Sequence, residues 1–181
     1  MRRWVVDTNV PIVANGRVGP NDRLPHSIEC REAAVRFLLD VLGSGKILVD
    51  LEGAIQAEYR TYLNPRGQPG VGDRFYQAVL NSAPHHLERV SLPRRHDGEY
   101  ADLPQTVIDV GFDRSDRKFA ALAKKEDATV ANATDSDWLN HLDTLQAAGI
   151  VVHFVCGCDK NGWFVGVDGG LNPCKSGDQA I

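Results

Sequence analysis

The chain has 181 residues, of which 43% are hydrophobic and 24% are charged, and its formal net charge is −4. These values are typical of one globular domain, and no apolar run approaches the ~18 residues of a membrane span. The negative net charge excludes a protein that attracts nucleic acid through its overall field, so such binding would need a local basic patch. The sequence after Met1 lacks the pattern of a secretory signal, and a cytoplasmic location is expected.

Short runs of β-branched and aromatic residues alternate along the chain with segments of helical periodicity. The expected strands cover residues 4–6, 46–50, 87–92, 128–131 and 150–155, and the expected helices cover 28–42, 51–63, 73–82, 113–125 and 135–148. This alternation predicts the α/β class, with three α/β/α layers around a central, mostly parallel five-stranded sheet. One domain is expected over residues 1–155, followed by a C-terminal tail, 156–181, that packs on it through Trp163 and Phe164.

Two acids follow expected strands. Asp7 ends the first strand, where Thr8, Asn9 and Pro11 break the extended run. Asp135 follows the fourth strand. In a parallel sheet both positions lie at the carboxyl edge, where open α/β sheets place their ligand crevices. Because Asp135 also precedes a helix, N-capping is its competing interpretation.

Glu58 lies on the expected helix 51–63. It follows Ile55 by three residues and Leu51 by seven, so it shares their face of the helix. Glu is seldom buried without a partner. The position therefore favours a role in a functional site, and an ion pair with Arg31 or Arg60 at the rim is the alternative.

Asp116 lies in the first turn of the expected helix 113–125. Phe119 and Ala120 follow it by three and four residues, which places it on the inward face. A capping-box role near the helix start is the competing interpretation. Asp113 precedes the helix and fits the cap better, which leaves Asp116 for the site.

Four carboxylates, Asp7, Glu58, Asp116 and Asp135, are thus expected to converge. Like charges this close cannot all stay ionised without a cation, so the sequence predicts a divalent-metal site. Oxygen ligands suit Mg²⁺ or Mn²⁺. Asp137 is either a further acid of this site or an acid of the first turn of its own helix.

The four cysteines are Cys30, Cys156, Cys158 and Cys174. Reduced thiols are expected, as in a cytosolic protein. A zinc site formed by His153 with the last three is the alternative, although zinc sites prefer C-x₂-C spacings to C-x-C.

From Trp4 to about Val155 the motifs together resemble the PIN-domain nucleases. That family has Asp-Thr-Asn or Asp-Thr-Ser after strand one, Glu on the helix after strand two, Asp opening an Ala-rich helix, and a closing Thr-x-Asp-x-Asp-Phe-like element. The corresponding segments here are Asp7-Thr8-Asn9, Glu58-Tyr59, Asp116 with Phe119-Ala120-Ala121-Leu122-Ala123, and Thr134-Asp135-Ser136-Asp137-Trp138. The sequence differs at Ala133, where the family often has Thr or Ser, and at Trp138, where Phe is usual.

The resemblance implies a PIN-like fold and hydrolysis of phosphodiester bonds with Mg²⁺ or Mn²⁺, leaving 5′-phosphate and 3′-hydroxyl ends. It implies that the catalytic acids and metal ligands are Asp7, Glu58, Asp116 and Asp135, joined by Asp137 as a metal-site acid. Thr8 and Asn9 would support the site, with Asn9 fixing Asp7.

An acidic site repels phosphates, so positive residues are expected around it. The candidates for contact with an RNA substrate are Arg60, Arg66, Arg94, Arg95, Arg114, Arg117 and Lys118. For each of them a solvated charged face is the alternative. A toxin of a toxin–antitoxin module is one role open to such an endoribonuclease. Its possible partners are then an antitoxin or regulatory protein, or a second copy of the chain in a homodimer.

Three alternatives of other kinds remain. A catalytically inactive PIN-like binding or scaffold module is disfavoured because all four acids are present. A structure-specific DNA nuclease would carry more acids and a helical arch. A haloacid-dehalogenase-like phosphatase would need Asp-x-Asp after the first strand, and Asn9 occupies the second of these positions.

Overall fold

The computed structural model describes residues 2–17, 26–81 and 86–156. The expected packing of the tail through Trp163 and Phe164 falls in residues 157–181 and lies outside these ranges. None of the helices in the described ranges is both long enough and apolar enough to cross a membrane.

The core is one five-stranded sheet in which all strand pairs are parallel. The strands are β1 (Arg3–Val6), β2 (Lys46–Asp50), β3 (Leu87–Val90), β4 (Thr129–Asn132) and β5 (Val151–Phe154), in the order β3-β2-β1-β4-β5. The α/β class and the five expected strands are confirmed, and the sheet is wholly rather than mostly parallel. The order changes direction between β1 and β4, which makes this point the topological switch of the sheet.

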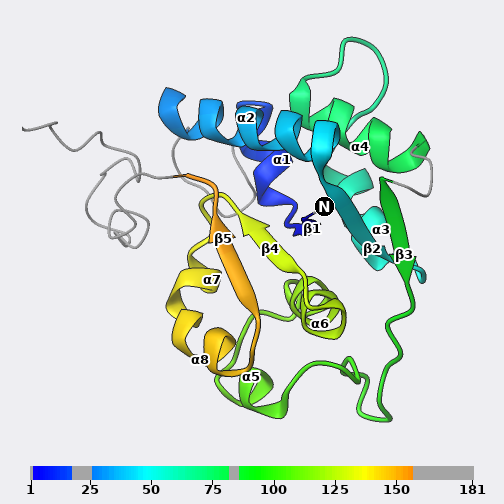
Figure 1. Cartoon of the computed structure of the whole chain (residues 1–181), viewed down its shortest axis with the longest axis vertical. Helices are drawn as coiled ribbons and strands as arrows, with labels where there is room; N and C mark the ends of the chain where they lie inside the picture. The colour runs from blue at the N-terminus through cyan, green and yellow to red at the C-terminus, as the bar shows by residue number, and fades with distance from the viewer. Residues whose placement is uncertain (1, 18–25, 82–85, 157–181) are drawn as a thin grey trace, which may run out of the picture.

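Eight helices in the described ranges cover the sheet. They are α1 (Asn9–Ala14), α2 (Ile28–Ser44), α3 (Ala54–Tyr62), α4 (Val71–Asn81), α5 (Gln105–Asp109), α6 (Arg117–Glu126), α7 (Ser136–Asn140) and α8 (Leu142–Ala147). Helices α1, α2 and α4 pack on one another, α6 lies against β1, β2 and β4, and α8 lies against β5. Figure 1 shows these two groups on either side of the sheet, which gives the expected three layers.

The middle strands are apolar because both of their faces are covered. Val5, Val6, Leu48 and Val49 have no measurable exposure, as expected for parallel strands between two helical layers. At the sheet edge, β5 alternates between exposed and half-buried residues. The buried middle of the sheet is what fixes the ends of β1 and β4 relative to each other.

Two helices were not expected from the sequence. Helix α1 includes Pro11, which was interpreted as a breaker. Pro11 is the third residue of α1. The first four N–H groups of a helix have no partner within the helix, so the N–H that proline lacks costs no helical hydrogen bond there. Helix α5 is a short helix of five residues between the expected strand 87–92 and the expected helix 113–125, where no element was predicted.

Helices α2 and α4 match the expected helices 28–42 and 73–82 to within two residues, and the other three expected helices differ more. Helix α3 begins at Ala54 rather than at residue 51, because the Asp50 carboxylate accepts hydrogen bonds from the N–H groups of Ala54 (2.6 Å) and Ile55 (2.8 Å). Helix α6 begins at Arg117 rather than at 113. The expected helix 135–148 is two helices, α7 and α8, that meet at His141.

Cys30 and Cys156 form a disulfide, with their Cα atoms 5.1 Å apart. The expectation of reduced thiols is therefore wrong for this pair. The bond also removes Cys156 from the alternative zinc site, because its sulfur is already bonded. Cys30 lies in the first turn of α2, and Cys156 lies two residues after β5, so the bond ties the helical layer to the edge of the sheet.

Replacing Cys30 by serine should lower the free energy of unfolding by about 2–5 kcal/mol, because the bond joins residues 126 positions apart and restricts the unfolded chain. Urea unfolding of the oxidised protein and of Cys30→Ser measures the difference. Cys174→Ser, which leaves this bond intact, is the control. Identical unfolding of the wild-type protein with and without a reductant would contradict the bond.

Candidate functional site

Asp7 lies at the centre of the carboxyl edge, directly after β1, and is only 3% exposed. Its Oδ1 accepts a hydrogen bond from the Asn9 backbone N–H at 2.9 Å. Its Oδ2 accepts one from Trp138 Nε1 at 2.7 Å. The backbone N–H of Asp7 donates to the Ala131 carbonyl of β4 at 3.0 Å. The carboxylate is thus held in one orientation by donors at the start of α1 and on α7, and the backbone of Asp7 is tied to β4.

Asn9 links the end of β1 to the end of β4. Its Nδ2 donates to Asn132 Oδ1 at 2.6 Å, and its Oδ1 accepts from the Ala133 N–H at 2.7 Å. Asn132 Nδ2 in turn donates to the Asp135 carbonyl at 2.8 Å, and its Oδ1 accepts from the Asp135 N–H at 3.2 Å. These bonds place Asp135 relative to Asp7. Asn132 is fully buried.

Sequence reasoning missed Asn132. The available signal was an amide side chain directly after the expected strand 128–131 and three residues before Asp135. An amide buried at such a position needs hydrogen-bond partners. Thr8, the other expected supporting residue, is also buried, and its hydroxyl has no hydrogen-bond partner among the described residues. It therefore makes no visible contribution to orienting Asp7.

Asp116 enters the site from the turn before α6 and is 6% exposed. It occupies the N-cap position of α6, yet its side chain makes no capping hydrogen bond. Asp113, expected as the helix cap, instead closes the turn: its Oδ1 accepts from the N–H and the hydroxyl of Ser115, both at 2.6 Å. Asp116 is thus left to face the other acids.

Asp135 is the N-cap of α7, where its Oδ1 accepts from the Asp137 N–H at 2.9 Å. The competing interpretation of Asp135 as a cap is therefore correct in structural terms. It does not exclude a site role, because the charge of Asp135 reaches both Asp7 and Asp116.

Asp137 is engaged on both of its oxygens. Oδ2 accepts from the Asp113 N–H at 2.9 Å, and Oδ1 lies 3.1 Å from His141 Nδ1. Asp137 thereby joins the turn of Asp116 to α7. Through the bond to Asp113, Asp137 helps to position the turn that carries Asp116.

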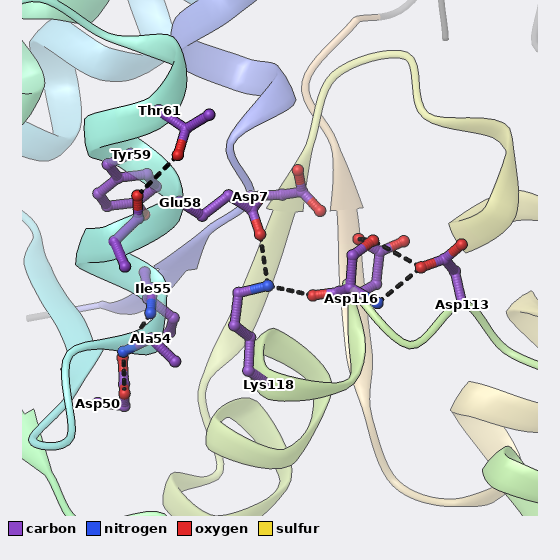
Figure 2. Close-up of polar contacts among 12 residues, drawn as sticks. Asp7, Asp50, Ala54, Ile55, Glu58, Tyr59, Thr61, Asp113, Asp116 and Lys118 are labelled. Carbon is purple, nitrogen blue, oxygen red and sulfur yellow. Dashed lines mark hydrogen bonds and ion pairs between the residues drawn. The ribbon is translucent and has the colours of Figure 1, made fainter. Parts of the chain in front are cut away.

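Glu58 projects from α3 toward the same edge and forms an ion pair with Lys118 of α6. The neighbouring Tyr59 is fully buried, and its hydroxyl donates to the Val6 carbonyl at the end of β1. Burial, and then the charge of Asp7, raise the pKa of Tyr59 well above its usual range, so this hydroxyl remains a donor. Figure 2 shows Glu58, Asp7, Asp116 and Lys118 around one space at the strand ends.

The acids of this edge repel one another's charge. Burial, then the charges of Asp135 and Glu58, raise the pKa of Asp7 from 3.8 to about 8, against the lowering effect of the bonds from Asn9 and Trp138. Burial, then the charges of Asp7 and Asp135, raise the pKa of Asp116 to about 10. Strongly perturbed acids gathered at a switch point are typical of a functional site.

In residues 2–17, 26–81 and 86–156 no three His, Cys, Asp or Glu side chains are arranged, as they stand, to hold a metal ion. Asp7 is turned toward Trp138, and Glu58 is turned toward Lys118. The chemistry of the donor set nevertheless fits a hard divalent cation. Its donors are carboxylate oxygens, and a cation among them would offset the repulsion that adds to burial in raising the pKa values of Asp7 and Asp116.

Among the expected RNA contacts, Arg117 is buried and already bonded. Its Nε donates to the Phe112 carbonyl at 2.9 Å, and its guanidinium forms an ion pair with Glu99. Lys118 is likewise buried against Glu58. These two cations support the site from inside and present no free charge to a substrate.

The other expected contacts lie nearer the surface. Arg94 donates to Tyr100 Oη (2.8 Å) and stacks over its ring, and Arg95 donates to Gln105 Oε1 (3.1 Å). Arg60 is exposed at the end of α3. Arg114 is also exposed, with 85% of its side chain accessible, and it sits in the turn between Asp113 and Asp116.

Comparison with known proteins finds no matching family model, no similar curated protein and no similar solved structure.

Metal-free protein should become less stable as the pH rises from about 4 toward 10, because folded Asp116 keeps a proton that the unfolded chain loses near 3.8. Asp116→Asn mimics the protonated carboxyl, so it should raise the melting temperature at pH 8 and leave it unchanged near pH 3.5. The exposed Asp40→Asn on α2 is the control.

Asp116 suits this test better than Asp7, because both oxygens of Asp7 accept hydrogen bonds and an Asn would turn its NH₂ toward a donor. A stability gain of equal size at both pH values would contradict the assignment of the effect to charge.

Proposed function

We propose that this protein is a PIN-like endoribonuclease that hydrolyses RNA phosphodiester bonds with Mg²⁺ or Mn²⁺. The observation that carries the proposal is the cluster of Asp7, Asp116 and Asp135 at the switch point of a parallel sheet, with Glu58 beside it. Burial, and then the charges of the neighbouring acids, raise the pKa values of Asp7 and Asp116 far above the usual range. An arrangement that costs stability in this way is expected to be retained for binding a cation.

The chain's own groups would then divide the work. Asp7, Asp116 and Asp135 provide the oxygen ligands, and a bound divalent ion supplies the charge that activates water and offsets the charge of the phosphate. Asn9 and Trp138 hold Asp7 in place, so its orientation is set before any ligand binds. Asp137 and Asp113 hold the turn that carries Asp116.

RNA would reach the site across exposed cations. Arg114 is the best placed, since it is two residues from Asp116. Its ion-pair partner Glu99 is 3.9 Å away and is already paired with Arg117, so the Arg114 guanidinium is only weakly engaged. Arg94, Arg95 and Arg60 remain proposed contacts on the surface. Arg117 is withdrawn from that set because its guanidinium is buried and bonded.

Asp135→Asn tests the proposal with little risk to the fold, since Asn caps a helix as well as Asp does. The variant should lose Mn²⁺-dependent cleavage of single-stranded RNA by about two orders of magnitude or more, the scale of losing one electrostatic group of an active site. Its circular dichroism and melting should stay near those of the wild type. Asp40→Asn should cleave normally.

EDTA should abolish cleavage by the wild-type protein, and added Mg²⁺ or Mn²⁺ should restore it. Cleavage that persists in excess EDTA would rule out metal dependence. Cleavage of duplex DNA with no effect on RNA would favour the DNA-nuclease alternative, and binding of RNA without cleavage would favour the inactive scaffold.

Arg114→Ala should weaken RNA binding and reduce the slope of log K against log salt concentration by about one, because one phosphate contact is lost. Fluorescence anisotropy over a salt series measures both. Arg36→Ala, which removes an exposed arginine paired with Glu32 on α2, is the matched control. An unchanged slope for Arg114→Ala would remove this residue from the RNA surface.

A further inference from the structure

A pocket of about 540 Å³ lies at the end of α3, between the loop that follows this helix and α4. Its volume is in the ordinary range of ligand pockets. Arg60 and Arg66 line it, and none of the described residues around it is an acid. On a chain whose net charge is −4, the pocket is therefore a local basic patch of the kind that a nucleic-acid backbone requires.

Both of these arginines present their charge to solvent. Arg60 and Arg66 are exposed, and within the described ranges neither guanidinium is engaged in a hydrogen bond or an ion pair. They differ in this from Arg117, which is buried and bonded, and from Arg17, whose guanidinium pairs with Asp73. An open guanidinium can bind a phosphate group through two parallel hydrogen bonds.

The loop on one side of the pocket is held by Asp73, which is buried near the start of α4. Its carboxylate accepts hydrogen bonds from the N–H groups of Asn64 (2.8 Å) and Gly70 (3.3 Å). Arg17 donates to the same carboxylate at 2.9 Å and to the Tyr62 carbonyl at 3.0 Å. The end of α3 and the loop are thus tied to α4. The pocket has its shape before a ligand enters, which lowers the cost of binding.

The pocket also has an aromatic and apolar part. The side chain of Tyr62 is exposed there, and so is Leu80 of α4, while Tyr76 is buried below them. An exposed aromatic ring beside free cations is the arrangement that single-stranded nucleic acids use. A base stacks on the ring, and the phosphates meet the positive charge.

The pocket lies one helical turn from the acids. Tyr62 follows Glu58 by four residues on α3, so their side chains leave neighbouring positions of the helix, with Cβ atoms about 5–6 Å apart. Figure 2 shows Thr61, which also lines the pocket, further along α3 than Glu58. An RNA strand with its scissile phosphate at the acids would therefore place a neighbouring nucleotide at the pocket.

We infer that this pocket binds one nucleotide of single-stranded RNA, with its base on the Tyr62 ring and its phosphate on Arg60 and Arg66. The inference rests on the proposed function and adds to it a subsite for a nucleotide beside the cleaved bond. The subsite selects single strands, because a base inside a duplex is already stacked and cannot reach the ring.

The first test measures the binding of a fluorescein-labelled oligouridylate by anisotropy in EDTA, so that binding is observed without cleavage. Tyr62→Ala should weaken binding about tenfold, the scale of one lost base stack. Tyr62→Phe should restore the affinity, because it keeps the ring. Leu39→Ala, which truncates an exposed leucine of α2 outside the pocket, is the matched control and should bind as the wild type does.

The second test separates the base from the phosphate by using inorganic polyphosphate as the ligand. Tyr62→Ala should leave polyphosphate binding unchanged, because this ligand has no base. Arg60→Ala and Arg66→Ala should weaken the binding of both ligands, and each should lower the slope of log K against log salt concentration for RNA by about one. Arg36→Ala is the control for loss of an exposed arginine.

An unchanged affinity of folded Tyr62→Ala for oligouridylate would overturn the stacking role, and so would an equal loss of affinity for polyphosphate. A polyglutamate peptide that displaces the RNA as well as polyphosphate does would overturn the subsite in favour of an acidic protein partner. The expected variant pattern without cleavage in Mn²⁺ would support the subsite and contradict only the proposed reaction. Cleavage in Mn²⁺ by a protein whose RNA affinity ignores Tyr62 and Arg60 would contradict the subsite alone.

Discussion

The convergence of buried acids at the carboxyl edge of the sheet is the constraint on which the rest of this structure depends. The strand order β3-β2-β1-β4-β5 puts β1 beside β4, so Asp7 and the segment of Asp135 meet although they are far apart in sequence. The turn before α6 adds Asp116. Each acid adds to the charge that opposes ionisation of the others, so the fold must hold them together against their repulsion.

Neutral hydrogen-bonding groups do most of this holding. The Asn9 and Asn132 amides join the two strand ends, the Trp138 indole fixes Asp7, and the Tyr59 hydroxyl ties α3 to β1. All of these groups are neutral, so none of them forms an ion pair with the acids. Within the described residues, Lys118 is the contrasting case of a cation placed among them, and it is matched to Glu58. The scaffold thus orients Asp7 through neutral hydrogen-bond donors.

The sheet could be predicted from the sequence because its signals are local. Runs such as Val5-Val6 and Ile47-Leu48-Val49 identify buried strands, and their alternation with helices implies parallel pairing. The helix starts were less predictable, because they depend on long-range or competing contacts. Asp113 has the sequence context of a helix cap, yet its carboxylate closes a turn with Ser115. The Cys30–Cys156 bond joins residues whose proximity exists only in the folded sheet.

For the site, the sequence identifies residue types and strand-end positions, whereas side-chain partners decide roles. Asp135 and Asp137 are two residues apart in one motif, but Asp135 caps α7 through its Oδ1, whereas both oxygens of Asp137 are engaged by the Asp113 N–H and His141. Arg114 and Arg117 are three residues apart, but Arg114 in the turn before α6 faces solvent, whereas Arg117 at the start of α6 is bonded to Glu99 and Phe112. A carboxylate that caps a helix through one oxygen keeps its negative charge. Capping and ligand binding are therefore compatible roles at Asp135, and the N-cap bond is what aims this acid at Asp7 and Asp116.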